Sequence, residues 1–438
     1  MKNQNDPLPP PSALVTTFEQ ARYWLAGEAH RVIRASLRRM KDGTAAFPPQ
    51  VGIGYEAFWL RDYAYCLEGS ADSFSTGELT DACRLFVRNV RADGAGVDCV
   101  QFDGTAIYKP GYGAMGQEPV TDGPAFTVDV VWHTWRQTRD EALRQECFPA
   151  LVRTMDYLPR NPTNGLVHIA APGERCPYGF TDSIPKSGDQ LFDSLLAVQA
   201  YRQLGELAGG QHYTTEAERI AGSVRTVLWD ASIGLFRATT GNCNVPDIWG
   251  SAFAVYLDVA TREQSLAIAR YFRDHYGELT QAGQVRHVPG FMDWQGRQTA
   301  TNGGSYQSGA FWGTPVGWFV YTLDLVDANL AEQALVDMVR FYQQHGTCEW
   351  INGEQLRFPG YLASAALPLA GIRALQQRRA SQSGSAGRIA AGRVTLESPA
   401  FAFTLDVNDS LCAVAWENRL TGCTLDLGNG PEVAFDIG

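Results

Sequence analysis

The stretch SGDQLFDSLLAVQAYRQLGEL, residues 187–207, decides the fold class expected for this chain. Its apolar residues recur about three or four positions apart, with Gln and Arg between them: Leu191, Leu195, Leu196, Val198 and Leu204. A period near 3.6 residues puts such side chains on one face of an amphipathic helix. The stretch therefore predicts a helix packed on a core. The same pattern continues along most of the chain up to about residue 378.

Twelve segments carry this helical pattern. They are residues 17–40, 57–69, 76–92, 124–139, 141–158, 187–207, 213–229, 247–258, 262–276, 313–326, 329–345 and 361–378. Some connections are short, whereas others are long and rich in Gly, Pro and aromatic residues, at 93–123, 159–186, 277–312 and 346–360. This alternation predicts an all-α fold, an (α/α)6 barrel of six helical hairpins with its long loops at one end. An α-solenoid would need a repeat of fixed period, which the sequence lacks.

The two ends of the chain differ from this helical region. Residues 1–16 predict an N-terminal extension before a barrel of residues 17–378. Residues 379–391 are small and polar, as in a linker, and residues 392–438 alternate in the manner of strands. Three or four strands are few for an independent sheet. We therefore expect a short C-terminal β-rich tail, which either packs on the barrel or begins a β-domain that has been cut short.

Composition and charge narrow the classes of function. With 438 residues, 45% hydrophobic and 19% charged, the chain is expected to be a soluble globular protein with a large core. A formal net charge of −11 offers no basic field for nucleic acid. No apolar run reaches the roughly 18 residues of a membrane-spanning helix. Because the start MKNQNDPLPPP also lacks the apolar segment of a signal peptide, we expect a cytoplasmic protein without membrane contact.

Several common chemistries have no motif in this sequence. It contains no Gly-rich phosphate cradle, no Gly-x-Ser-x-Gly elbow and no His-Glu-x-x-His helix. The nine cysteines form no Cys-x-x-Cys pair, and the seven histidines are dispersed. We expect no cofactor and no catalytic metal, and leave open a calcium ion held by loop carbonyls.

Aromatic residues are frequent and often lie in the long loops. They make up 11% of the chain, including 11 Trp and 17 Tyr, and many stand beside Gly, Asp and Arg. Flat aromatic faces stack on the C–H faces of sugar rings while polar neighbours bind the hydroxyls. For any single Trp, burial in the core is an equally good interpretation. The pattern favours a carbohydrate as the ligand.

The segment YEAFWLRDY, residues 55–63, leads from an aromatic pair into adjacent Arg61 and Asp62 at a helix start. In a sugar site, Asp62 would accept hydrogen bonds from two ring hydroxyls, and Arg61 would orient it or donate to another oxygen. Trp59 would supply a wall of the site. The alternative is an Arg–Asp surface pair at an ordinary helix start.

The segment YGFTDSIPK, residues 178–186, places Asp182 between aromatic residues in a long loop. Partial loss of water around such a carboxyl raises its pKa, so that it can stay protonated and act as a general acid. Tyr178 is a candidate substrate contact beside it. The alternative is an N-cap or Asx-turn aspartate, which spacing alone slightly favours.

The segment HGTCEWINGE, residues 345–354, lies between the last two predicted helices. We interpret Glu349 as a general base that activates water on the opposite face of the sugar, with Trp350 as a substrate contact. The rival is Glu354, which follows a turn-like Asn-Gly and is expected to face solvent.

Further loop residues are candidate substrate contacts because they combine polar groups with aromatic neighbours. They are Asp122, His287, Trp294, Gln307 and Trp312. Plain loop packing explains each of them equally well.

Three of these segments together resemble the six-hairpin glycosidase superfamily. FWLRD, residues 58–62, is similar to the Trp-x-Arg-Asp element that holds the terminal sugar, and FTDS, residues 180–183, resembles the general-acid loop. FWGTPVGW, residues 311–318, followed after one more helix by Glu349, resembles the aromatic-Gly-Pro helix start and the general-base loop. The nearest resemblance is to inverting, exo-acting enzymes such as processing α-glucosidase, trehalase and the glucosidase part of glycogen-debranching enzyme. It spans about residues 17–378.

This resemblance implies a glycoside hydrolase that inverts the anomeric centre of an oligosaccharide or glycoside, with an α-glucoside favoured. Asp182 would protonate the leaving oxygen, and Glu349 would take a proton from the attacking water. Asp62 and Arg61 would hold the non-reducing sugar. The chain departs from the family pattern in lacking a Glu-x-Tyr-Asn segment around Glu349 and a large N-terminal β-sandwich. The sugar, the linkage and the oligomeric state do not follow from the sequence.

Two other functions remain open. A sugar epimerase or polysaccharide lyase on the same barrel would use His or Tyr for proton transfer, for which His287 and His345 are candidates if Glu349 faces away. A non-catalytic carbohydrate-binding protein would keep the aromatic residues with only one of the two carboxylates.

Overall fold

The computed structural model describes most of the chain. The described residues are 13–109, 118–290, 294, 304–382, 387–390, 392–397, 401–407, 412–419 and 421–427. Most of the predicted N-terminal extension and part of the predicted linker therefore lie outside the described residues. The chain divides into two compact units, Met1–Ile372 and Arg373–Gly438.

Twelve helices of eight or more residues occur in the described residues, and each overlaps one of the twelve predicted segments. They are α1 (Phe18–Ser36), α2 (Leu60–Ser70), α3 (Thr76–Arg88), α4 (Gly123–Thr138), α5 (Glu141–Asp156), α6 (Leu191–Ala208), α7 (Gln211–Val227), α8 (Ile248–Tyr256), α9 (Arg262–Asp274), α11 (Val316–Leu323), α12 (Ala328–His345) and α14 (Pro368–Gln382). Two four-residue helices accompany them, α10 (Tyr276–Leu279) and α13 (Ala363–Ala366). The helix-rich fold predicted from the sequence is confirmed.

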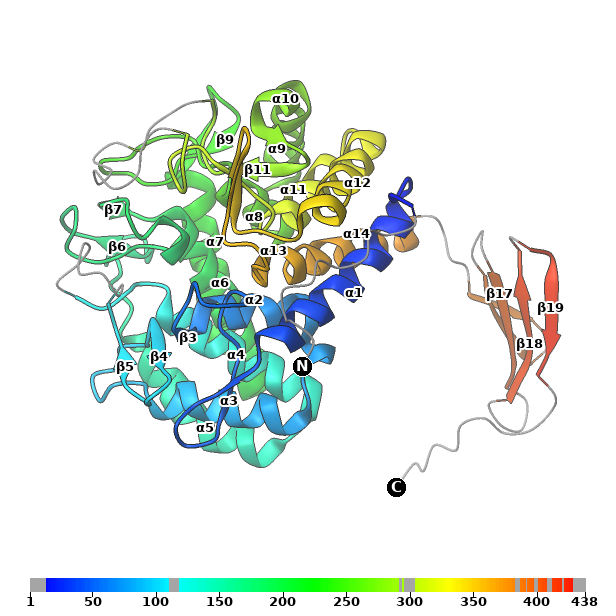
Figure 1. Ribbon diagram of the computed structural model, residues 1–438, viewed down its shortest axis with the longest axis horizontal. Coiled ribbons are helices and arrows are strands. Elements are labelled where there is room, and N and C mark those ends of the chain that lie inside the picture. Colours follow the sequence, from blue (N-terminus) through cyan, green and yellow to red (C-terminus); the bar gives the residue numbers. More distant parts are fainter. Residues whose placement is uncertain are drawn as a thin grey trace, which may run out of the picture. The chain divides into compact units, whose positions relative to one another are not determined.

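The helices of the first unit contact one another in a closed order (Figure 1). Helix α2 packs on α4, α4 on α6, α6 on α8 and α8 on α11, while α13 packs back on α2. Helices α11 and α14 approach closely, since a Cβ atom added at Gly371 would lie 2.3 Å from the backbone of Gly317. Each of the remaining long helices contacts at least one helix of this order. This order is consistent with the predicted (α/α)6 barrel.

Burial differs between helix α2, which belongs to the closed order, and helix α9, which does not. All residues of α2 are buried, whereas α9 buries only one face, with Gln264, Ile268, Ala269 and Phe272. A helix buried on all sides must place its polar groups against partners, because an unpaired buried charge is costly. The polar side chains of α2 therefore mark positions where the fold or its function requires them.

Short strands pair the long connections with one another. One sheet contains β3 (Ala57–Trp59), β4 (Cys99–Gln101) and β5 (Ala106–Ile107). A second contains β10 (Thr280–Gln281), β11 (Gln284–Arg286), β12 (Phe311–Trp312), β13 (Trp350–Asn352) and β14 (Gln355–Arg357). Trp312 pairs with Trp350, which joins the loop before α11 to the loop after α12. Sequence periodicity missed these strands because two or three residues carry too little alternation to detect.

Three further antiparallel pairs tie single connections together. They are β1 (Arg38–Arg39) with β2 (Ala45–Ala46), β6 (His168–Ile169) with β7 (Gly188–Asp189), and β8 (Trp229–Asp230) with β9 (Leu235–Phe236). Two 3-10 turns complete the first unit, η1 (Ala71–Ser73) and η2 (Gly179–Thr181).

Two predicted helices differ from the structure in their bounds for local reasons. The segment predicted to start at residue 57 begins as strand β3, so α2 starts at Leu60. The last predicted helix is divided into α13 and α14 at Pro368, because proline has no N–H to donate to the preceding turn.

The second unit contains five consecutive antiparallel strands. They are β15 (Gly387–Ala390), β16 (Arg393–Glu397), β17 (Phe401–Asp406), β18 (Cys412–Asn418) and β19 (Cys423–Asp426). These strands lie where the sequence predicted a β-rich tail. Residues 428–438 of that tail lie outside the described residues, and its interpretation as a shortened β-domain stays a prediction.

Candidate active site

Two buried aspartates hold the turn that leads to Asp182. Turn η2 begins after Tyr178, whose backbone N–H donates to Asp193 Oδ2 at 3.1 Å. The next N–H, of Gly179, donates to Asp122 Oδ2 at 2.8 Å. Asp122 is the N-cap residue of α4 and Asp193 lies in the first turn of α6. Two inner helices thus fix the backbone of the Asp182 loop, residues 178–186.

The Asp182 carboxyl is partly buried and, among the described residues, has one side-chain hydrogen-bond partner. Gln307 Nε2 donates to Asp182 Oδ1 at 2.7 Å. Burial raises the pKa of Asp182 to about 6, against the lowering effect of this hydrogen bond and of Arg61. A carboxyl with such a pKa keeps its proton to a higher pH than an ordinary aspartate does, a shift in the direction that a general acid needs.

Glu349 lies just before β13 and is 2% exposed. The Tyr55 hydroxyl donates to Glu349 Oε1 at 2.6 Å, while the buried Oε2 has no hydrogen-bond partner among the described residues. Burial raises the pKa of Glu349 to about 8 despite the Tyr55 hydrogen bond, with further increases from the charges of Asp62 and Asp182. Glu354, by contrast, lies in the exposed turn between β13 and β14, as the sequence predicted.

The electrostatic couplings place Asp182 and Glu349 at one site. The charge of Asp182 raises the pKa of Glu349. Burial raises the pKa of Tyr306 well above its ordinary value, and the charges of Asp182, Glu349 and Asp62 raise it further. Interactions of this kind fall off with distance, so Tyr306 lies near all three carboxyl groups. Tyr306 also has a left-handed backbone with φ of +47°, which is strained for a bulky residue and is typical of functional loops.

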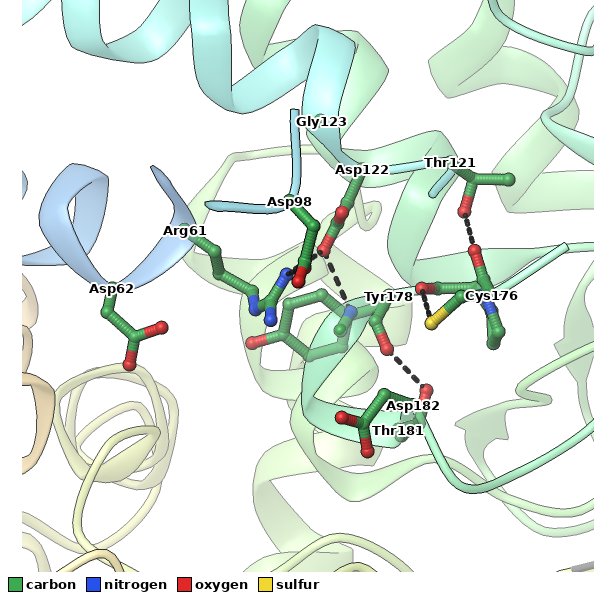
Figure 2. Close-up of polar contacts among 12 residues, drawn as sticks. Arg61, Asp62, Asp98, Thr121, Asp122, Gly123, Cys176, Tyr178, Thr181 and Asp182 are labelled. Carbon is green, nitrogen blue, oxygen red and sulfur yellow. Dashed lines mark hydrogen bonds and ion pairs between the residues drawn. The ribbon is translucent and has the colours of Figure 1, made fainter. Parts of the chain in front are cut away.

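Asp62 and Arg61 have different partners although they are adjacent. The Tyr361 hydroxyl donates to Asp62 Oδ1 at 2.5 Å, and burial raises the pKa of Asp62 to about 6. Arg61 Nη1 lies 3.3 Å from Asp98 Oδ1 and 3.2 Å from Asp122 Oδ2. Figure 2 shows Arg61 directed toward these two aspartates, with the Asp62 carboxyl apart from them. The sequence offered Arg61 either as a group that orients Asp62 or as a donor to another oxygen; the hydrogen bond to Asp62 comes from Tyr361, and Arg61 pairs with Asp98 and Asp122.

Arg61 also packs against the Asp182 loop. Its guanidinium lies over the Phe180 ring, 5.7 Å from the ring centre. A Cβ atom added at Gly179 would lie 1.9 Å from Arg61 Cζ. Only glycine at position 179 therefore lets the guanidinium lie against this turn while it pairs with Asp98 and Asp122.

Partly exposed aromatic residues stand beside the carboxylates. Trp59, Tyr55 and Tyr306 are partly exposed, and Phe358 is 37% exposed. The Tyr55 ring lies edge-on to Trp59 at 5.0 Å and 5.3 Å from Phe358. These faces can stack on a sugar ring that reaches Glu349.

Most of the other predicted substrate contacts are buried. Exposed fractions are 6% or less for Tyr178, His287, Trp294, Gln307, Trp312 and Trp350. Tyr178 hydrogen-bonds the Tyr65 hydroxyl at 2.7 Å. These side chains are buried in the free protein, and direct contact with substrate stays a prediction for them.

His287 and His345 do not form a proton-transfer pair at this site. His287 is 1% exposed, stacks on Trp249 at 4.3 Å and lies 3.3 Å from Asp247. Burial lowers its pKa, and the charge of Asp247 opposes that shift. His345 is exposed at the end of α12. Glu349 does not face away from the site, since Tyr55 bonds it, so one part of the condition for an epimerase or lyase fails; that alternative stays a prediction, because tyrosines as well as histidines can transfer protons.

The sequence missed several residues that shape the site. They are Asp98, Asp193, Tyr306 and Tyr361, none of which was among the predicted site residues. Asp193 had one available signal, because a carboxylate in the first turn of a hydrophobic helix is usually partnered. Tyr361 follows Pro-Gly at a helix start, which is an aromatic-before-helix pattern like that of Trp312. Asp98 had no local signal.

The described residues contain neither a metal-binding cluster nor a membrane-spanning helix. Among them, no group of three or more His, Cys, Asp or Glu side chains is arranged to hold a metal ion. Among them, too, no helix has the length and apolar character needed to cross a membrane.

Solved structures share this fold. A GH63 mannosylglycerate hydrolase from Thermus thermophilus matches at 18% identity, over 80% of this chain and 100% of its own, with TM-scores of 0.58 in complex with glucose and 0.60 in complex with Tris. A rhamnosidase from Klebsiella oxytoca with rhamnose bound matches at 14% identity, over 85% of this chain and 66% of its own, with a TM-score of 0.56. No family model and no curated protein matches the sequence. The chain thus shares its fold with this hydrolase and this rhamnosidase.

Proposed function

We propose that this protein is an inverting glycoside hydrolase with Asp182 as general acid and Glu349 as general base. One observation carries the proposal: two carboxyl groups with raised pKa values lie near the same partly exposed tyrosine, Tyr306, and couple to each other. The sugar hydrolases that share the fold support the same class of reaction.

The two carboxyl groups divide the reaction between them. Asp182 gives its proton to the glycosidic oxygen as the bond from that oxygen to the anomeric carbon breaks, so the leaving group departs as a neutral alcohol. Glu349 takes a proton from a water molecule as the water oxygen bonds the opposite face of the anomeric carbon. Asp182 ends ionised and Glu349 protonated, and exchange with solvent restores the starting state.

Substrate binding must shift the proton that the pair shares. In the free protein the pKa of Glu349, about 8, exceeds that of Asp182, about 6, so at neutral pH the shared proton lies mainly on Glu349. Among the described residues, none donates a hydrogen bond to Glu349 Oε2. A water or sugar hydroxyl that donates to this oxygen stabilises the carboxylate and lowers its pKa. The bound state then has Glu349 ionised and the proton on Asp182.

The terminal sugar is recognised beside these groups. Asp62, held by Tyr361, accepts hydrogen bonds from sugar hydroxyls, and Trp59 and Tyr55 offer stacking faces. We favour exo action on an oligosaccharide or glycoside resembling an α-glucoside, as the sequence resemblance implies. The mannosylglycerate hydrolase and the rhamnosidase support a glycoside without fixing the sugar.

A substrate screen with product analysis tests this proposal. The protein is incubated with nitrophenyl α- and β-glycosides of glucose, mannose and rhamnose and with natural disaccharides, and the first-formed anomer is followed by proton NMR. We expect at least one glycoside to be hydrolysed to the opposite anomer, and no turnover by an Asp182→Asn, Glu349→Gln double variant. A product of retained configuration, or sugar binding without turnover across the screen, would contradict the proposal.

A further inference from the structure

The orientation of the Gln307 side-chain amide is fixed by Ser183. The backbone N–H of Ser183 lies 3.0 Å from Gln307 Oε1, and its hydroxyl donates to the same atom at 2.5 Å. A backbone N–H can only donate, so this atom of Gln307 must be the oxygen. The amide nitrogen therefore points the other way, toward Asp182 Oδ1 at 2.7 Å.

The backbone around Gln307 is held as firmly as its side chain. The Gln307 carbonyl accepts a hydrogen bond from Trp294 Nε1 at 2.7 Å, and the Tyr306 carbonyl accepts one from Trp312 Nε1 at 3.1 Å. Tyr306 keeps its strained left-handed backbone in this arrangement. Strain of this kind persists only where the surroundings impose one conformation. Gln307 thus approaches Asp182 from a rigid support on another segment of the chain.

We infer that Gln307 is a positioning residue that keeps the catalytic proton of Asp182 on Oδ2, the oxygen that Gln307 does not contact. An amide NH₂ group has only hydrogens to offer, so Asp182 Oδ1 can face it only as an acceptor. A protonated Oδ1 would be a weaker acceptor for this N–H than the carbonyl oxygen of the acid, so the hydrogen bond favours the proton on Oδ2. When Asp182 is protonated, its O–H therefore lies at Oδ2. This inference rests on the proposed role of Asp182 as general acid.

The same geometry separates Gln307 from a substrate contact. Its side chain is 1% exposed, and both amide heavy atoms already have partners within the protein. Gln307 should therefore affect the rate of a reaction that needs the Asp182 proton and should not affect the rate of one that does not need it. Fluoride leaves from the anomeric carbon with far less need of protonation than an alcohol does, so a glycosyl fluoride makes this distinction.

The test compares Gln307→Glu on two substrates with one sugar. Glutamate has nearly the same shape and can still accept from Ser183, but when ionised it has no hydrogen to give Asp182. The probes are methyl α-D-glucopyranoside and α-D-glucopyranosyl fluoride, or the same pair of the sugar that the screen selects. We expect kcat on the methyl glycoside to fall roughly 10–100-fold, a fraction of the 10²–10⁴-fold worth of a general acid. Hydrolysis of the fluoride should stay within about threefold of wild type.

A matched control exists elsewhere in the barrel. Gln203 Nε2 donates to Asp129 Oδ1 at 2.5 Å between α6 and α4, which is another buried Gln–Asp pair. Gln203→Glu makes the same chemical change away from Asp182 and should leave the ratio of the two rates at the wild-type value. Gln307→Ala, read by the same ratio, covers the case in which the glutamate variant does not fold.

The outcomes separate the two proposals. Equal losses on both substrates would overturn the positioning role, and a raised KM on both with unchanged kcat would make Gln307 a substrate contact. If Asp182→Asn also lost both activities equally, the general-acid assignment itself would fail. If Asp182→Asn spared the fluoride while Gln307→Glu did not, only the inference about Gln307 would fall.

Discussion

The Asp182 loop and the Glu349 segment, residues 347–361, surround their carboxyl groups in different ways. Asp182 sits on a turn held by Asp122 and Asp193, has an amide donor, and has a pKa of about 6. Glu349 is more deeply buried, has a single tyrosine donor, and has a pKa of about 8. The difference shows that surroundings, and not residue type, set the order of proton affinities. In the free protein at neutral pH, the proton therefore lies mainly on Glu349, which must lose it before it can act as the proposed general base.

The largest expected effect comes from neutralising either carboxyl group. Asp182→Asn and Glu349→Gln should each lower kcat on alkyl glycosides by roughly 10³-fold or more, because each removes one proton transfer. The two variants should then diverge: glycosyl fluoride should restore only Asp182→Asn, and added azide should restore only Glu349→Gln, giving the glycosyl azide. Steady-state kinetics with circular dichroism as the folding control decides this. Exchange of the two rescue patterns would reverse the roles of acid and base.

Glycine substitutions compare the rigidity of the two segments. In Gly179→Ala the new methyl group would collide with Arg61 and separate it from Asp98 and Asp122. Breaking a buried ion pair costs about 3–5 kcal/mol, so we expect a loss of that order in the free energy of unfolding. Gly353→Ala in the turn after β13 meets no neighbouring atom and has only its φ of +57° to strain, worth about 1–2 kcal/mol. Urea unfolding measures both, and equal losses would show that Arg61 is free to move.

Removing the phenol of Tyr55 sharpens the pKa comparison. The Tyr55 hydrogen bond lowers the pKa of Glu349, so Tyr55→Phe should raise that pKa further. The proton would then stay on Glu349 and not move to Asp182. We expect kcat/KM to fall about tenfold, the worth of one hydrogen bond to a charged group. Wild type should give a bell-shaped profile between about pH 6 and pH 8, and the variant should move the alkaline limb upward.

The control for this variant is Tyr361→Phe. Tyr361 donates to Asp62 and not to Glu349, so its loss should raise KM and leave the alkaline limb in place. An alkaline limb that stays put in Tyr55→Phe, or moves equally in both variants, would break the link between that limb and Glu349.

The smallest effect concerns stability. The folded pKa of Glu349, about 8, lies above its ordinary value of 4.5, so the folded state holds a proton that the unfolded state releases. The stabilisation from this group is complete below the unfolded pKa and is lost as the pH rises through about 8. Gln does not ionise, so Glu349→Gln should raise Tm above wild type by about 2–4 °C at pH 8.5 and by less at pH 5. A variant less stable than wild type at pH 8.5 would contradict this.

Sequence patterns predicted the helical skeleton and the two central carboxyl groups. Each of the twelve predicted segments overlaps a helix of eight or more residues, because local periodicity is enough to reveal a helix. The choice of Glu349 over Glu354 agrees with their burial, since a turn-like Asn-Gly next to Glu354 is a local signal for exposure. Whether these carboxyl groups carry out the proposed roles stays a prediction until the variants are measured.

The partners of those carboxyl groups could not be predicted in the same way. Tyr55 reaches Glu349 across 294 positions, and Tyr361 reaches Asp62 across 299. The adjacency of Arg61 and Asp62 predicted an interaction, but successive residues of a helix point in different directions. Their partners therefore come from different neighbouring elements.

The sequence by itself determined where the helices of this protein lie and which loops carry its carboxylates and aromatic residues. These properties depend only on residues a few positions apart in the chain. Only the tertiary structure decided that Gln307 meets Asp182, that Tyr55 meets Glu349, and that burial gives the two acids different proton affinities. Hydrogen bonding and desolvation depend on distance in space, and the closed order of the helices sets those distances among residues far apart in the chain.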